Sequence, residues 1–222
     1  MILMKMLLKI LIVATISGAA VLAQRAAAPG EKAREISFDR KVPIPARIVN
    51  DDREVIITKY ASPPLVFYED RTLGEVIDEY TELHDTVLVV SGFSSSGKLV
   101  DNETWVRTTV DATIVEFIKS RTLDRSTKRV AFWHDDGEVF VKHVRVRAGV
   151  YPVFSPKDRY LLFLGRDDHG QLYLSQVFRL TQDGPLGSVL QSNGEVQRLT
   201  APFTGQSEQK ILERLRKAAR KK

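Results

Sequence analysis

The chain contains no cysteine. This absence excludes disulfide bonds, a thiol nucleophile, a thiolate metal site and a lipid-modified cysteine at a processing site. Histidine is scarce as well, with four residues in 222, and none of them recur at the i, i+4 spacing of a zinc-protease helix. Stability must therefore come from an apolar core, which the 43% of hydrophobic residues can supply.

The first 23 residues have the order of a secretory signal peptide. Lys5 and Lys9 give a positive start, and residues 10–22 are almost entirely apolar. Val21 and Ala23 then offer small or short side chains at the −3 and −1 positions before Gln24. The apolar run is shorter than the ~20 residues that a membrane-spanning helix needs. We therefore expect a cleaved signal peptide over 1–23 and an exported protein, periplasmic or extracellular. The alternatives are an uncleaved membrane anchor and a second processing site after residues 26–28.

Basic residues are concentrated at the two ends of the chain, although the net charge of the whole is only +5. Residues 1–23 hold two lysines, and residues 209–222 hold seven basic residues and one acidic residue. The remainder of the chain then has 24 basic and 27 acidic residues. Since a nucleic-acid-binding domain normally carries a basic stripe, we expect no nucleic-acid partner.

The order of sequence patterns predicts a small, mainly β protein. Residues 24–46 are rich in Ala, Pro and charge and are expected to form an extended leader with little core of its own. A hairpin is predicted over 47–60, followed by a helix that starts with a capping box at Thr72 and carries apolar residues at helical spacing as far as Leu83. Further strands are predicted at 86–90, 104–119, 128–133, 138–147, 160–164, 172–180 and 196–199.

Turn residues separate several of these strands. The triplet Asp135-Asp136-Gly137 predicts a hairpin, because a turn with positive φ favours Asp and Gly, and residues 167–170 predict another turn. The continuously apolar run 160–164 is typical of a strand buried on both faces. Trp105 and Trp133 are expected on strands, packed in or over the fold.

The last 16 residues predict a basic amphipathic helix over 207–222. Ile211, Leu212, Leu215 and Ala219 form a narrow apolar stripe among basic side chains. We expect this stripe to dock on the body, and weak contact with a membrane surface is the alternative. The expected fold class is thus a small OB-like barrel, closed or partly open, over 47–206, with one packed helix and a C-terminal basic helix.

Residues 92–98 match the Gly-x-x-x-x-Gly-Lys spacing of a phosphate-binding loop. That chemistry also needs a Ser or Thr after the lysine and a helix that begins there, but Leu99 follows Lys98. The same stretch fits Ser-x-x-Lys through Ser95, yet the companion motifs of penicillin-recognising proteins are absent. We therefore predict a flexible loop at 92–98.

Two Asp-rich turns and one sequon are the remaining candidate motifs. His134 and His169 each lie beside paired aspartates, and two such turns brought together could bind a divalent metal. The alternative, which we prefer, is that Asp and Gly serve turn geometry alone. Asn102-Glu103-Thr104 is a glycosylation acceptor by pattern only.

From about residue 70 to 180 the order of elements resembles bacterial exported domains similar to netrin-like domains and the tissue inhibitors of metalloproteinases. The resemblance is carried by TLGEVIDEYTELHD, by DTVLVVSG, by the long strand after it, and most sharply by the segment Arg159–Leu164 (RYLLFL). It implies an OB-type barrel of five strands with a helix packed against it. The inhibitors chelate the protease zinc through an N-terminal cysteine, which is absent here, and the family's Lys-Gly turn is Lys119-Ser120-Arg121 in this chain.

Protease inhibition is therefore not implied, and the sequence assigns no catalytic, cofactor-binding or metal-binding residue. We expect an exported, non-catalytic binding or interaction module for an unknown protein or extracellular ligand. The alternatives are a hydrolase-type enzyme whose Asp, Glu and His residues are assembled from separate turns, and a protein inhibitor that acts through its loops.

Overall fold

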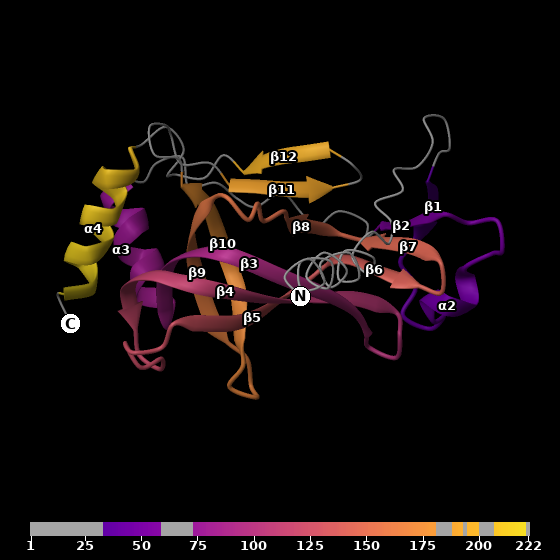
Figure 1. Ribbon diagram of the computed structural model, residues 1–222, viewed down its shortest axis with the longest axis horizontal. Helices are drawn as coiled ribbons and strands as arrows, with labels where there is room; N and C mark the ends of the chain where they lie inside the picture. Colours follow the sequence, from indigo (N-terminus) through magenta and orange to yellow (C-terminus); the bar gives the residue numbers. More distant parts are fainter. Residues whose placement is uncertain (1–32, 59–72, 181–187, 193–194, 200–206, 221–222) are drawn as a thin grey trace, which may run out of the picture. The chain divides into compact units, whose positions relative to one another are not determined.

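The computed structural model describes residues 33–58, 73–180, 188–192, 195–199 and 207–220 (Figure 1). Segments 1–23 and 24–32, and therefore the expected signal peptide, lie outside these residues. The described chain is mainly β, as predicted, with the expected helix at its C-terminal end. Its elements are β1 (Arg34–Ser37), α2 (Ile44–Arg47), β2 (Glu54–Thr58), α3 (Leu73–Leu83), β3 (Thr86–Val100), β4 (Trp105–Ser120), β5 (Arg129–Asp135), β6 (Gly137–Val141), β7 (Val144–Ala148), β8 (Val150–Pro152), β9 (Arg159–Arg166), β10 (Leu172–Leu180), β11 (Ser188–Ser192), β12 (Glu195–Leu199) and α4 (Glu208–Arg220).

Five strands form a closed ring in the order β10-β5-β4-β3-β9. β3, β4 and β5 pair successively as antiparallel neighbours, and β9 returns to pair with β3, which is a Greek-key order. β10 forms an antiparallel pair with β9 and closes the ring through a parallel contact between Tyr173 and Trp133 of β5. The strands expected at 104–119, 128–133, 160–164 and 172–180 all belong to this ring.

β9 is buried on both faces, as its unbroken apolar sequence predicts. Tyr160, Leu162 and Leu164 point into the ring, where residues from all five strands form one core cluster. Leu161 and Phe163 point outward into a second cluster, which the helices cover. The alternation along a strand places successive side chains on opposite faces, so this strand joins the two cores.

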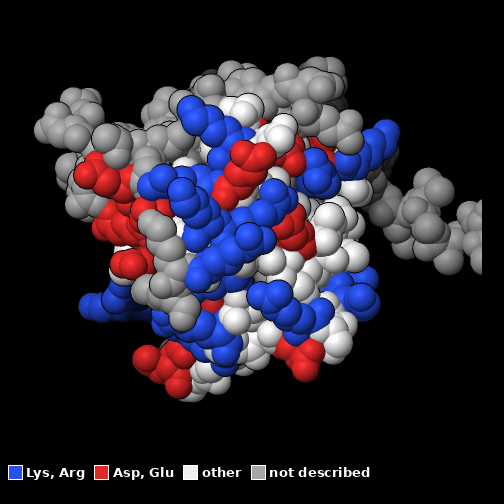
Figure 2. All heavy atoms as spheres, turned by 90° about the vertical axis from the view of Figure 1, so that its left-hand side faces the viewer, with Lys and Arg blue, Asp and Glu red and all other residues white. Residues whose placement is uncertain are grey.

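α3 and α4 cover the outer side of the ring together. The predicted apolar stripe of α4 is confirmed, because Ile211, Leu212 and Leu215 are buried in the same cluster as Ile77 of α3 and Ala219 packs against that cluster. The predicted face of α3 is only partly right, since Leu83 is 71% exposed. Lys and Arg side chains gather over the surface that carries α4 (Figure 2).

Ion pairs hold α4 in this position. Arg214 bonds to Asp78 of α3 at 3.1 Å, Arg216 forms two bonds to the Glu116 carboxylate of β4 at 2.7 and 2.8 Å, and Arg159 of β9 bonds to Glu208 at 2.6 Å. The basic side chains of the helix are thus partly used within the molecule. Among the described residues, no helix is long and apolar enough to cross a membrane.

A second sheet has the order β1-β2-β7-β6 and forms its own core with the far end of the β3–β4 hairpin. The 15-residue β3 and 16-residue β4 extend beyond the ring, and Trp105 and Val106 of this extension pack against Val144 and Val146 of β7. One long hairpin therefore belongs to both cores. A third sheet, β12-β11-β8, contains the expected late strand at 196–199.

The expected leader and the expected hairpin at 47–60 both differ from the structure. Residues 34–37 form a strand that pairs in parallel with β2, and Ile36 and Ile44 are buried in the second core. β2 has parallel partners on both sides, so it belongs to no hairpin. The Asn50-Asp51-Asp52 segment instead places the Asp52 carboxylate against Arg34 at 2.5 and 2.7 Å.

The expected hairpin at 135–137 is also wrong. β5 pairs with β4 and β10, whereas β6 pairs with β7, so Asp136-Gly137 carries the chain from the ring to the second sheet. The actual hairpin turn is Lys142-His143, where Val141 pairs with Val144 and Lys142 has a φ of 58°. The segment expected as one strand over 138–147 is therefore two.

Candidate functional site

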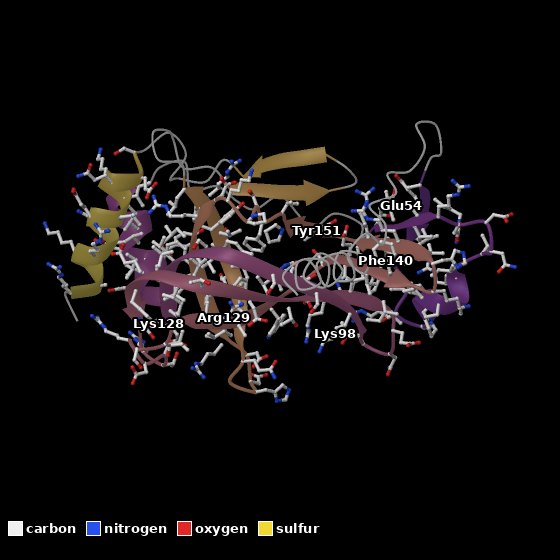
Figure 3. The ribbon with its side chains drawn as sticks, viewed as in Figure 1. Glu54, Lys98, Lys128, Arg129, Phe140 and Tyr151 are labelled. Carbon is white, nitrogen blue, oxygen red and sulfur yellow. The ribbon has the colours of Figure 1, made fainter. Side chains whose placement is uncertain are left out.

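A pocket lies where the ring meets the second sheet and β8. We call it the junction pocket, and its volume is about 220 Å³. Its lining residues come from β3 to β8 and the segment that follows: Ser95, Thr108, His134, Gly137, Glu138, Arg145, Tyr151, Pro152, Val153 and Phe154. Figure 3 labels Tyr151 of β8 together with Glu54 and Phe140 of the second sheet.

Two glycines allow the strands around this pocket to approach each other. A Cβ on Gly97 of β3 would overlap the Glu138 carbonyl of β6, and a Cβ on Gly137 would overlap the Thr108 hydroxyl of β4. Gly137 also has a φ of 133°, in the region that disfavours residues with side chains. The glycines therefore fix the distance between ring and sheet, and this distance sets the width of the pocket.

His134 is buried at the ring side of the pocket and is 6% exposed. Its burial lowers its pKa below the ordinary value, although the Asp135 carbonyl and carboxylate act in the opposite direction. Nδ1 lies 2.9 Å from the Asp135 carbonyl oxygen. Because a carbonyl can only accept, Nδ1 carries the proton and the neutral ring keeps Nε2 as a hydrogen-bond acceptor.

The second sheet contributes an ion pair to the pocket. Arg145 of β7 donates from Nε and Nη2 to one oxygen of Glu138 at 3.0 and 2.5 Å. Behind this pair, Arg147 lies 2.7 Å from the carboxylate of Glu54. The two acids and two bases form a network without net charge.

Tyr151 stands beside this network and is 8% exposed. Its hydroxyl is buried and makes no well-aligned hydrogen bond among the described residues, although the Glu138 carboxylate lies close enough to act on it as a hydrogen-bond acceptor. Burial raises the pKa of Tyr151, and the nearby Glu138 carboxylate raises it further, so the hydroxyl stays protonated at neutral pH. Burying a hydroxyl without a well-formed hydrogen bond is unfavourable, so this group is a position where a ligand or water gains a bond.

Phe154 forms the apolar wall of the pocket. Its ring stacks on Phe93 with centroids 4.6 Å apart, and it contacts Tyr160 and Phe132 of the ring core edge-on at 5.2 and 6.2 Å. Val153, beside it, is 43% exposed. The pocket therefore has an aromatic surface continuous with the ring core, and its polar groups come from the ring, the second sheet and β8.

The structure does not bring the two histidine turns together as a metal site. His134 lies buried on β5, whereas His169 is exposed in the turn before β10. The contact between the two segments is a bond from Trp133 Nε1 to Asp167 at 3.1 Å. Among the described residues, no group of three or more His, Asp and Glu side chains is placed to hold a metal ion.

Residues 92–98 are a strand and not the predicted loop. Ser94 to Val100 pair in register with Asp111 to Trp105 of β4, after an irregularity between Ser91 and Ser94, so the segment is extended and does not wrap as a phosphate-binding loop does. Gly97 serves the close contact with Glu138, and Ser95 lines the junction pocket. The sequence analysis did not identify Glu138, Arg145 and Tyr151. A single strand over 138–147, as predicted, would have kept Glu138 and Arg145 apart, whereas the β6–β7 hairpin brings them together.

A second pocket of about 360 Å³ lies between the end of α3, the end of β4 and α4. Its acids and bases are mixed, and Lys119 already donates to the carbonyl oxygens of Thr81, Glu82 and His84 at the end of α3. Because these groups serve the packing of the helices, the junction pocket is the better candidate site. No family model matches the chain, and no curated protein matches it.

Proposed function

We propose that this chain is an exported, non-catalytic binding module whose ligand occupies the junction pocket. The single observation that carries the proposal is a pocket that combines an aromatic surface with polar groups, among them the buried Tyr151 hydroxyl, which makes no well-aligned hydrogen bond within the described residues. Ligand sites typically combine a mostly apolar surface with a few placed polar groups, and the mouths of barrels are frequent positions for them.

We further propose that the ring is an OB-type barrel and that the chain is a distant relative of the netrin-like and inhibitor domains. The support is the closed order of five strands with a Greek-key return, together with helices on its outer side. The segment RYLLFL, which carries the sequence resemblance most sharply, belongs to β9 and contributes side chains both to the inside of the ring and to the core beneath the helices. The second sheet and its hairpin extension are additions to a five-stranded barrel.

The proposed location and partners follow from the sequence and charge. Export rests on the signal-peptide pattern of 1–23, and the absence of a nucleic-acid partner rests on the acidic balance of the body. The exposed Lys210 and Lys217 of α4 are available for weak contact with an anionic membrane surface, since the apolar stripe is used in packing.

A hydrolase is the second candidate, because His134 and Glu138 line one pocket and a neutral imidazole can act as a general base. A panel of fluorogenic esters, amides and glycosides distinguishes the two. Turnover by the wild-type chain that is lost in His134→Gln would establish an enzyme and refute the non-catalytic proposal.

Ligand-observed NMR with a library of small polar fragments tests binding directly. We expect fragments that bind the wild-type chain and lose affinity in Tyr151→Phe, while Tyr173→Phe on the outer surface of the ring serves as the matched control. If no fragment distinguishes the Tyr151 variant from the control, the junction pocket is not the site.

A fusion of residues 1–23 to a reporter that is active only after export tests the location.

A further inference from the structure

The junction pocket combines electrical neutrality with many hydrogen-bonding groups, and this combination narrows the chemistry of its ligand. We propose that it binds one neutral sugar ring of a glycan. This inference rests on the proposed binding function and names its ligand class.

The charge of the lining argues against an ionic ligand. Glu138 and Arg145 are the acid and base of the pocket, and they neutralise each other through two bonds to one carboxylate oxygen. Glu54 and Arg147 form the neighbouring pair at 2.7 Å. A charged ligand would have to break one of these pairs to gain an ionic partner and would leave the other member uncompensated.

The polar groups suit hydroxyls, which both donate and accept. His134 Nε2 can only accept, and the Tyr151 hydroxyl can both donate and accept. The remaining guanidinium nitrogen of Arg145, Nη1, can only donate and lies 3.9 Å from the Glu54 carboxylate. The remaining polar lining consists of the Ser95 and Thr108 hydroxyls, of which Thr108 already donates to the Asp136 carbonyl at 2.9 Å. Adjacent hydroxyls on a ring satisfy this alternation of donors and acceptors with one rigid unit.

The size and the apolar wall agree with a single ring. A volume of about 220 Å³ is smaller than the roughly 300 Å³ at which pockets begin to enclose whole drug-sized ligands, so the pocket holds one unit of a longer molecule. Phe154 and Val153 provide an apolar surface for the C–H face of the ring.

An extended peptide fits this site less well. Peptides commonly add a strand to an exposed sheet edge. On the side that faces the ring, the edge of β6 is already occupied by other backbone. Asp136 forms a bridge with Arg107, and the Asp136 amide donates to the Val106 carbonyl at 2.9 Å. The Glu138 carbonyl lies against Gly97. The lining therefore presents side chains and few free backbone groups.

The experiment uses three sugars that share a ring and differ in charge. Backbone amide shifts of the isotopically labelled chain are followed while each sugar is added. The three sugars are N-acetylglucosamine, which is neutral, glucosamine, which is cationic, and glucuronic acid, which is anionic. Glucose and galactose are tested as further neutral sugars, and triglycine is tested as a peptide. We expect a neutral sugar to shift amides of β6 and β8, with weaker or no shifts from the charged sugars and triglycine. Tyr151→Phe should weaken the neutral sugar about tenfold, as one neutral hydrogen bond predicts, and Tyr173→Phe should not.

The other outcomes separate the two proposals. Binding of triglycine, of a charged sugar or of library fragments at the pocket without binding of neutral sugars overturns the sugar inference and leaves the binding module intact. Sugar binding that is equal in Tyr151→Phe and Tyr173→Phe places the sugar elsewhere and also overturns it. Absence of any shift in the pocket, with sugars and fragments alike, overturns both proposals.

Discussion

Replacement of Lys119 by methionine should destabilise the protein at the end of α3. The Lys119 ammonium donates to the carbonyl oxygens of Thr81, Glu82 and His84, the last at 2.8 Å. These are the carbonyl groups that the end of a helix leaves without intrahelical donors. A positive charge there also interacts favourably with the helix dipole. Methionine keeps the length of the aliphatic chain but removes both effects.

The expected loss is about 2 kcal/mol in the free energy of unfolding, since charge-assisted bonds contribute about 1.5–3 kcal/mol and three bonds from one ammonium do not add. For a chain of this size, 1 kcal/mol corresponds to a Tm change of roughly 2–4 °C, so Tm should fall by about 4–8 °C. Urea unfolding followed by tryptophan fluorescence gives the free energy, and differential scanning calorimetry gives Tm.

The matched control is Lys128→Met, because Lys128 is exposed just before β5 (Figure 3). It should change the free energy of unfolding by less than about 0.5 kcal/mol. Hydrogen exchange should accelerate at the end of α3 in Lys119→Met only. Equal stability of the two variants, with unchanged exchange at α3, would show that Lys119 does not cap this helix.

Three further predictions concern the close strand contact, buried histidine and backbone strain. Gly97→Ala should lower Tm more than Gly170→Ala, because a Cβ at Gly97 overlaps the Glu138 backbone. At Gly170 the φ of 76° adds about 1 kcal/mol of strain, but the Cβ meets only the tip of the flexible Arg166 side chain; similar losses in the two variants would contradict the contact. Burial lowers the pKa of His134, so the unfolded chain takes up a proton first as pH falls through about 6.5, and the free energy of unfolding should decrease below that pH. In His134→Gln this decrease, measured by urea titration between neutral and mildly acidic pH, should be smaller, and an unchanged slope would refute the assignment. Glu103→Gly should raise the free energy of unfolding by up to about 1 kcal/mol, because Glu103 has a φ of 62°; a loss of stability would show that its side chain matters more than its backbone.

Local patterns predicted most strands of the ring and the two helices beside it. The strand 160–164 was identified by its unbroken apolar run, and α4 by a stripe that the structure buries against α3. These predictions were correct because the spacing of apolar residues along the sequence shows which face of a strand or helix is buried.

Pairing between distant segments could not be predicted in this way. Asp135-Asp136-Gly137 has the residues of a hairpin turn, and Asp136 does adopt a φ of 74°, but the chain uses this conformation to leave the ring for the second sheet. The choice of partner for β6 depends on the apolar face of β7, which shares its core with Ile36 and Ile44. No local signal in 34–46 reveals that contribution, because two apolar residues among charges resemble a leader.

The candidate site was missed for the same reason. Ser95 and His134 come from the ring, Glu138 and Arg145 from the second sheet, and Tyr151 from β8. Ser95 and His134 were considered only in other motifs, and the five residues share no recognisable spacing with one another. Gly97, which was considered as part of a phosphate-binding loop, instead sets the separation of the walls. Only the topology that places β6 against the β3–β4 hairpin brings these residues together.

The long β3–β4 hairpin explains why the pocket can be rigid although three sheets build it. Its first half contributes Val89 and Val90 to the two cores beside and inside the ring, and its far half contributes Trp105 and Val106 to the core of the second sheet. Since the same two strands run through both halves, any tilt of the second sheet relative to the ring must bend this hairpin and disturb packed side chains at both ends. The width of the junction pocket is therefore coupled to the packing of both cores, and the polar groups on its two walls are held in place before any ligand arrives. Such preorganisation would reduce the entropic cost of binding the ligand that we propose.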